Sequence, residues 1–211
     1  MSDTRDIEAR LQLPRFIMMS GTYCAGKSTW TENYLKRVGG KRTWVSISFD
    51  GIVDDEAQKA GLSASELMQD KARYNRCTDI MLRRLEEALS AGENIVLDNT
   101  NTTVDWRASI LALVDAAPQP YHKTAVSMQV TKEEGETRFH ARNEAMTHLR
   151  EDQKVPVEKF HRHYAQYHAQ PQPDISEGFD LVLQVPTDQF RAERWQHTVS
   201  RANSTSSEQN L

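Results

Sequence analysis

The sequence predicts an α/β fold in which a five-stranded parallel sheet carries helices on both faces. Two observations lead to this prediction. Five short apolar or β-branched runs are separated by longer segments in which apolar residues recur every three or four positions. Strands and helices therefore alternate along the chain, and 211 residues are enough for one such domain with its own core.

The elements are expected in a regular order along the chain. Strands are predicted over residues 16–20, 43–49, 94–98, 122–130 and 179–185. Helices are predicted over 28–38, 71–91, 103–117, 131–148, 156–168 and 187–201, with short helices within 52–70. In the helix over 71–91, Tyr74 and Met81 occupy the recurring apolar positions, so we expect both side chains in the core.

Composition predicts where the folded domain begins and ends and in which cellular compartment the protein works. We expect a flexible leader over 1–13, a single domain over 14–201 with a helical lid at about 131–170, and a disordered serine-rich tail over 202–211. Two cysteines are too few for a disulfide framework, which fits a reducing cytoplasm. No apolar stretch is long enough to span a membrane, so no membrane partner is expected. The net charge of −4 restricts any nucleic-acid surface to a local patch.

A glycine-rich loop between the first strand and the first helix carries the clearest chemical signal. It matches G-x-x-x-x-G-K-[ST] at every fixed position, which predicts a phosphate-binding loop (P-loop), a P-loop NTPase fold, and ATP and Mg²⁺ as cofactors. Lys27 is expected to stand exposed at the mouth and reach the β- and γ-phosphates, and the Ser28 hydroxyl is expected on Mg²⁺. The candidate ATP-binding residues are Gly21, Thr22, Tyr23, Cys24, Ala25, Gly26, Lys27, Ser28 and Thr29.

Two aspartates follow predicted strands at the same edge of the sheet. Asp50 ends the second strand, where a carboxylate is placed to accept a proton from a substrate hydroxyl in line with the γ-phosphate. Asp98 ends the third strand and resembles a Walker B aspartate that holds Mg²⁺ directly or through water. Each aspartate has an alternative role as the cap of the helix that follows it.

The polar stretch after Asp98 is predicted to lie at the same mouth. Asn99, Thr100 and Asn101 are candidates for hydrogen bonds to the acceptor or to phosphate groups.

Three arginines on or after the helix that follows the fourth strand form a third candidate group: Arg138, Arg142 and Arg150. Phosphoryl transfer spreads negative charge over the equatorial oxygens, and guanidinium groups that close over them stabilise that charge. Arg138 and Arg142 are four residues apart and share one helix face. The alternative is a solvated face on which Glu134 and Glu144 pair with these arginines.

Over about residues 15–185, these features resemble the P-loop kinases related to the polynucleotide 5′-hydroxyl kinases. The resemblance rests on the P-loop, on the strand that ends at Asp50, on the run from Val96 to Asn101, on Arg142-Asn143, and on Arg150 before Pro156. It implies that Asp50 is the general base, that Lys27 and Ser28 bind ATP and Mg²⁺, and that Arg150 is the lid arginine on the transferring phosphate. Arg142 would then assist Arg150 at the transferring phosphate, and Arg138 is a candidate nucleotide-binding residue.

The sequence departs from the family pattern at two positions. Cys24 stands where these kinases usually carry glycine, and Val53 stands where they often carry an arginine three residues after the catalytic aspartate. The second departure implies a different contact to an acceptor phosphate.

The function that the resemblance implies is transfer of the γ-phosphate of ATP to a hydroxyl of DNA or RNA. The acceptor is either a polynucleotide 5′ end or a hydroxymethylated base, as in related phage DNA kinases. Two alternatives stay open: a small-molecule or zeta-toxin-like kinase on the same fold, and a nucleotide-dependent binding module without transfer.

Overall fold

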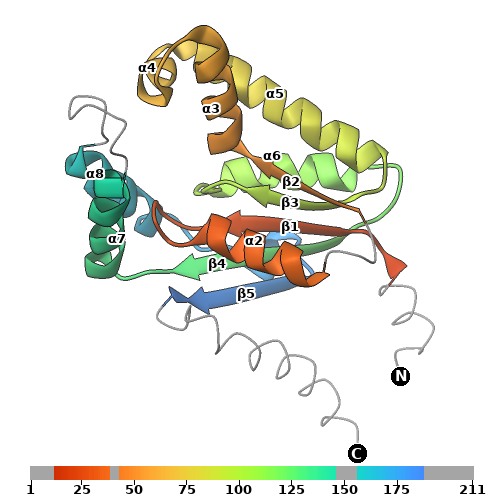
Figure 1. The fold of residues 1–211 in the computed structure, drawn as a ribbon. Helices are drawn as coiled ribbons and strands as arrows, with labels where there is room; N and C mark the ends of the chain where they lie inside the picture. The colour runs from red at the N-terminus through yellow and green to blue at the C-terminus, as the bar shows by residue number, and fades with distance from the viewer. Residues whose placement is uncertain (1–11, 39–42, 146–155, 188–211) are drawn as a thin grey trace, which may run out of the picture.

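The computed structural model of the protein describes residues 12–38, 43–145 and 156–187. Five strands form one sheet in which every neighbouring pair is parallel, in the order β2-β3-β1-β4-β5 (Figure 1). The strands are β1 (Arg15–Ser20), β2 (Trp44–Ser48), β3 (Asn94–Asp98), β4 (His122–Gln129) and β5 (Leu181–Pro186). The predicted five-stranded parallel sheet is therefore confirmed.

The helices follow the strands as the alternating pattern requires. They are α2 (Lys27–Val38), α3 (Phe49–Ala60), α4 (Ala64–Gln69), α5 (Lys71–Ser90), α6 (Val104–Asp115), α7 (Lys132–Ala145) and α8 (Val157–His168), with the short 3₁₀ turn η2 (Ile175–Glu177) before β5. The described helices α7 and α8 fall within the predicted lid and lie side by side near the carboxyl ends of the strands (Figure 1). The predicted helix over 187–201, the tail and most of the leader lie outside the described residues.

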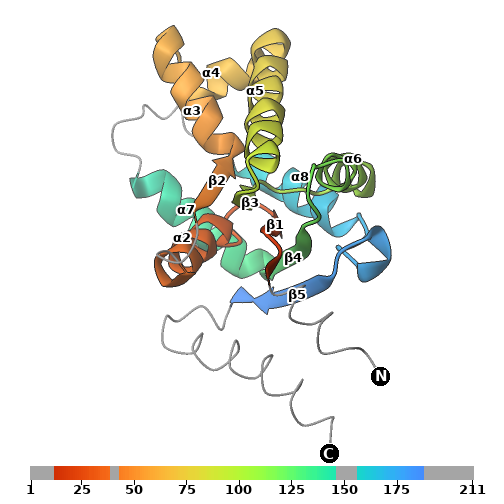
Figure 2. The same cartoon turned by 90° about the vertical axis from the view of Figure 1, so that its right-hand side faces the viewer.

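Helices cover both faces of the sheet because successive side chains of each strand point to opposite sides. On one face, Phe16 and Met18 of β1 pack in a core that α3, α5 and α6 complete. On the other face, Ile17 and Met19 pack with Trp30 of α2. Figure 2 shows α2 and α6 on opposite sides of the sheet. The central strand β1 is thus buried on both sides, which holds the loop after it in a defined place.

The start of α3 differs from the prediction. β2 ends at Ser48 and α3 begins at Phe49, so Asp50 lies in the first turn of a helix and not at the end of a strand. The Ser48 hydroxyl caps this helix by accepting from the Gly51 N–H at 3.2 Å. Likewise Thr103 caps α6. The alternative cap roles of Asp50 and Asp98 are therefore not observed, and both carboxylates remain available to a ligand.

Helix α5 confirms one core prediction and corrects another. Met81 is fully buried, as the periodic pattern indicated, but the Tyr74 side chain is 39% exposed. Tyr74 lies in the first turn of α5, where its ring meets the edge of Phe49 at a centroid distance of 5.3 Å. It therefore lines the ligand-facing side of the domain and not the core.

No helix within the described ranges is long and apolar enough to cross a membrane.

Candidate active site

A cleft of about 600 Å³, called the active cleft below, opens beyond the carboxyl ends of β1, β2 and β3. Ligands bind at this edge of open parallel sheets, beside the point where the strand order reverses. The predicted site residues that line it are Tyr23, Cys24, Gly26, Lys27, Ser28, Thr29, Asp50, Asp98, Asn99, Thr100, Arg138 and Arg142. The structure therefore brings together residues from four separate stretches of the chain.

The backbone of the P-loop has the conformation that its glycines predict. Gly26 has a φ of +90°, which a residue with a side chain rarely adopts. Gly21 lies so close to β4 that an added Cβ would be 3.0 Å from the Cβ of Met128. Cys24 also has a positive φ of 58°. This left-handed conformation gives a physical reason why related kinases place glycine at that position.

Lys27 is held by the loop itself. Its Nζ donates to the carbonyl oxygens of Gly21 at 3.0 Å and Thr22 at 2.9 Å, and the residue is half-buried. The expectation that it stands exposed at the mouth is wrong. Burial lowers the pKa of Lys27, while the negative charges of Asp98 and Asp50 oppose this change. The Lys27 side chain lies in the same active cleft as both carboxylates, where phosphate is expected.

Asp98 and Ser28 form an oxygen-rich pair at the first turn of α2. The Ser28 hydroxyl hydrogen-bonds the Asp98 carboxylate, and burial raises the pKa of Asp98 although Ser28 and Lys27 oppose this. Hydroxyl and carboxylate oxygens are ligands that Mg²⁺ prefers, together with water and substrate phosphates. Within the described ranges, no three His, Cys, Asp or Glu side chains gather to hold a metal ion alone. The donor set therefore fits a Mg²⁺ that arrives with a nucleotide.

Asp50 lines the same active cleft as this pair. Its side chain is exposed, and its negative charge acts on the pKa values of Lys27, Asp98 and Tyr23. Val53, where related kinases often carry arginine, is 2% exposed and packs in the core. An arginine at this position would bury its charged side chain in the core without a partner. The packing of α3 therefore favours an apolar residue at position 53.

The three polar residues after Asp98 have different positions. Asn99 and Thr100 line the active cleft. Asn101 is 1% exposed, donates to the Met19 carbonyl at 2.6 Å, and accepts from the Trp106 indole at 3.0 Å. Asn101 does not line the active cleft, because its amide joins this loop to β1 and α6, and its contact with a substrate stays a prediction.

Arg138 and Arg142 of the predicted lid line the active cleft, and their contact with a transferred phosphate stays a prediction. Arg138 forms an ion pair with Glu134, and it also donates to the Cys24 carbonyl of the P-loop at 3.4 Å. Arg142 is exposed and hydrogen-bonds the Cys24 thiol. Both guanidinium groups thus lie over the P-loop. Arg150, expected to contact the transferring phosphate, lies outside the described residues.

The sequence reading missed His163, which α8 brings to the P-loop. Its Nδ1 lies 3.3 Å from the Thr22 hydroxyl, and its ring lies 4.3 Å from that of Tyr23. Burial, with the charges of Lys27 and Lys159, lowers the pKa of His163 to about 4. The ring is therefore neutral at pH 7. Several histidines occur in this part of the chain, and no local pattern distinguishes His163 from the others.

The pKa of His163 leads to a pH-dependent prediction. The unfolded chain takes up this proton near pH 6.5, whereas the native chain takes it up only near pH 4. The neutral ring therefore contributes its full stability above about pH 6.5, and this contribution is lost as the pH falls towards about 4. We expect the His163→Gln variant to lose less stability than wild type between about pH 7 and pH 5 in urea unfolding. His140→Gln, on the exposed side of α7, is the control, and equal pH dependence in all three proteins would contradict the assignment.

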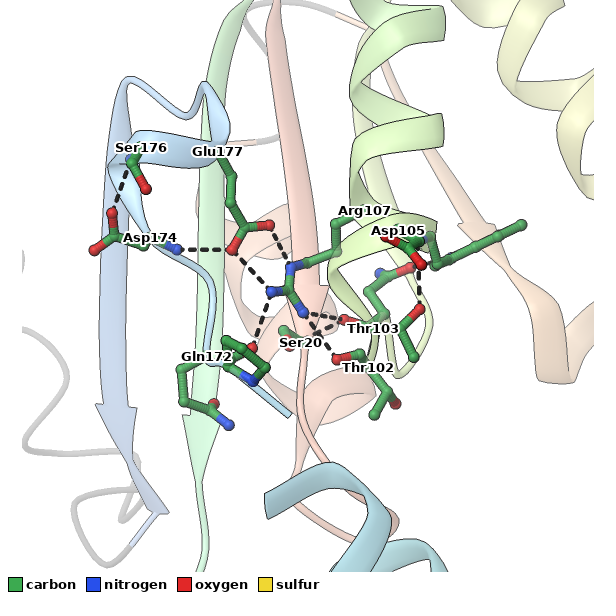
Figure 3. Close-up of polar contacts among 12 residues, drawn as sticks. Ser20, Thr102, Thr103, Asp105, Arg107, Gln172, Asp174, Ser176 and Glu177 are labelled. Atoms are coloured by element: carbon green, nitrogen blue, oxygen red, sulfur yellow. Dashed lines mark hydrogen bonds and ion pairs between the residues drawn. The ribbon is translucent and has the colours of Figure 1, made fainter. Parts of the chain in front are cut away.

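A second residue that was missed, Arg107, lies between the loop after β3 and the segment around η2 (Figure 3). Its side chain is 0% exposed and makes a two-point ion pair with Glu177, at 2.7 Å and 2.8 Å. The same guanidinium donates to the carbonyl oxygens of Asn101 and Thr102 and to that of Pro171. It therefore ties the loop after β3 to the connection between α8 and β5. A single arginine in an amphipathic helix carries no local signal of such a role.

A P-loop at the start of a helix, an oxygen pair suited to Mg²⁺, a further carboxylate in the same cleft and two arginines define a P-loop protein of the kinase-like class. The chain belongs to the family described as an AAA domain (AAA_33), which matches residues 16–171. No curated protein matches the chain in sequence.

Solved structures share the fold at low sequence identity. One, from the PezAT chromosomal toxin–antitoxin system of Streptococcus pneumoniae, is 17% identical with a TM-score of 0.61, and the match covers 88% of this chain and 74% of that one. A chain of the Pnkp1/Rnl/Hen1 RNA repair complex is also 17% identical, with a TM-score of 0.59 and coverage of 80% and 47%. Kti12 of Chaetomium thermophilum in complex with ADP-AlF₃ is 14% identical, with a TM-score of 0.58 and coverage of 89% and 97%.

Proposed function

We propose that the protein is an ATP-dependent kinase that transfers the γ-phosphate to a hydroxyl group of nucleic acid. The observation that carries the transfer chemistry is the position of Asp50. Its exposed carboxylate shares the active cleft with Lys27 and with the Ser28–Asp98 pair. A nucleotide-dependent binding module has no need of a carboxylate at this place. The complex of Kti12 with ADP-AlF₃ supports nucleotide binding by this fold.

The proposed step uses groups of this chain at each end of the reacting system. The Asp50 carboxylate accepts the proton of the acceptor hydroxyl, whose oxygen forms a bond to the γ-phosphorus. The bond from the γ-phosphorus to the oxygen that bridges the β- and γ-phosphates breaks, and ADP leaves. Lys27 and the P-loop N–H groups hold the phosphates, and Arg142 and Arg138 neutralise charge on the transferred group. Mg²⁺ held by Ser28 and Asp98 supplies further neutralisation of phosphate charge when bound.

Nucleic acid is the proposed acceptor because of the resemblance to the polynucleotide kinases and the polar mouth formed by Asn99 and Thr100. The similarity in fold to a chain of an RNA repair complex agrees with this proposal. A zeta-toxin-like acceptor is the second candidate, and the similarity to the PezAT structure favours it over other small-molecule kinases.

One labelling screen tests the proposal. ATP labelled at the γ-phosphate is incubated with the full chain and Mg²⁺, in the presence of 5′-hydroxyl oligonucleotides, hydroxymethylated duplexes or small sugars. We expect label on a polynucleotide, and we expect the yield to fall as salt rises, because cations must hold the acceptor phosphates. Label on sugars alone would replace the nucleic-acid acceptor by a small molecule. Absence of label on every acceptor would contradict the kinase assignment.

The Lys27→Ala variant is expected to lose most phosphate transfer while the fold is kept. Removal of one donor that stabilises transition-state charge typically lowers kcat by about 10²–10³-fold. The loop also loses two hydrogen bonds to Gly21 and Thr22, so a modest decrease in Tm is expected. Lys36→Ala, on the exposed side of the same helix, is the matched control. Unchanged turnover in the Lys27 variant would show that the loop does not bind the reacting phosphates.

A further inference from the structure

A second cavity of about 380 Å³, called the ring pocket below, adjoins the active cleft. It shares Phe49, Tyr74, Asn99 and Thr100 with that cleft, so the two cavities are neighbours, and Asp50 follows the shared Phe49 in the chain. One wall is the first half of α5, and the other is the loop after β3 with the start of α6. A group bound there would lie beside the cleft that Asp50 lines.

The ring pocket is chemically unlike the active cleft. Its described lining contains three aromatic residues, Phe49, Tyr74 and Trp106, together with amide and hydroxyl side chains such as Asn75 and Thr78. Within this described lining no side chain carries a charge, whereas the active cleft contains Lys27, Arg138, Arg142, Asp50 and Asp98. A phosphate or carboxylate group would lose its hydration here without gaining a cation.

The aromatic walls are held in place before a ligand arrives. Phe49 is 7% exposed and lies against the Tyr74 ring, and the Trp106 indole donates to the buried Asn101 amide oxygen at 3.0 Å. Pre-positioned aromatic faces bind flat rings with little further ordering cost. Polar groups beside them, on Asn75 and Thr78, suit the donors and acceptors at the edge of such a ring.

We propose that the ring pocket binds the uncharged nucleoside unit that carries the acceptor hydroxyl. This inference rests on the proposed kinase function and narrows its substrate class: the unit next to the hydroxyl is an uncharged flat ring with its sugar, and not a sugar phosphate. The size of the pocket agrees, since small-ligand sites range from about 300 to 1,000 Å³.

Calorimetric titration tests the proposal without any turnover. The full chain is loaded with Mg²⁺ and a non-hydrolysable ATP analogue, which fills the nucleotide site, and is then titrated with thymidine or with ribose 5-phosphate. We expect thymidine to bind more tightly than ribose 5-phosphate. Tyr74→Ala should weaken thymidine binding by about 5- to 100-fold, since one aromatic face is lost. Tyr74→Phe keeps the ring and should stay within about threefold of wild type.

The outcomes separate this proposal from the kinase assignment. Unchanged thymidine affinity in Tyr74→Ala, or tighter binding of ribose 5-phosphate than of thymidine, would overturn the ring-pocket proposal even if the enzyme transfers phosphate. Thymidine binding that depends on Tyr74, in a protein that labels no acceptor, would support the pocket and contradict the kinase. Because Tyr74 is 39% exposed, its replacement leaves the core intact, and equal Tm values for the two variants check this.

Discussion

Replacement of Asp50 by asparagine is expected to lower kcat by about 10²–10⁴-fold, which is the usual contribution of a general base. Asparagine keeps the size of the side chain but cannot accept the proton of the acceptor hydroxyl. ATP affinity should change little, because the P-loop, Lys27 and the Ser28–Asp98 pair stay in place. The helix should also remain intact, since Ser48 and not Asp50 provides its cap. Steady-state kinetics and ATP titration of the variant measure both quantities.

Two other outcomes would give Asp50 a different role. If ATP binding in the presence of Mg²⁺ weakens together with kcat, and extra Mg²⁺ restores part of the rate, Asp50 holds the metal ion. If activity stays near wild type, the carboxylate takes no part in the reaction. Asp55→Asn is the matched control, because Asp55 is exposed on the same helix and does not line the active cleft.

Replacement of Arg107 by methionine is expected to lower the free energy of unfolding by about 3–5 kcal/mol, the typical cost of removing one partner of a buried ion pair. Methionine fills a similar volume but leaves the Glu177 carboxylate, which is 12% exposed, without its cation. The carbonyl oxygens of Asn101, Thr102 and Pro171 lose their donors as well. Urea unfolding of the variant measures the loss.

A double variant distinguishes a lost ion pair from a general packing defect. In Arg107→Met combined with Glu177→Gln, the unpaired charge is gone, so part of the lost stability should return relative to the single arginine variant. A double variant as unstable as the sum of the two single variants would show that the two side chains do not act as a pair. Arg83→Met, whose side chain is 68% exposed, is the matched control.

Much of the fold and part of the site were predictable because their signals are local. The five strands, the P-loop and the helices between them follow from apolar spacing and from glycine positions within about ten residues of each other. Asp50 and Asp98 were expected at one edge because parallel strands end together, and both line the active cleft. The helix cap that Ser48 provides was not predicted. Its signal is also local, since serine is a common N-cap residue and Ser48 directly precedes α3.

The amino-acid sequence by itself determined the alternation of strands and helices and the loop that identifies a P-loop protein, since both depend on neighbouring residues. Only the tertiary structure decided which polar residues face a ligand. It buried Asn101, exposed Tyr74 beside Phe49, and joined Thr22 to His163 across 141 residues and Arg107 to Glu177 across 70. These contacts depend on how helices pack on the ends of the sheet, and the free energy of such packing is shared among residues far apart in the chain.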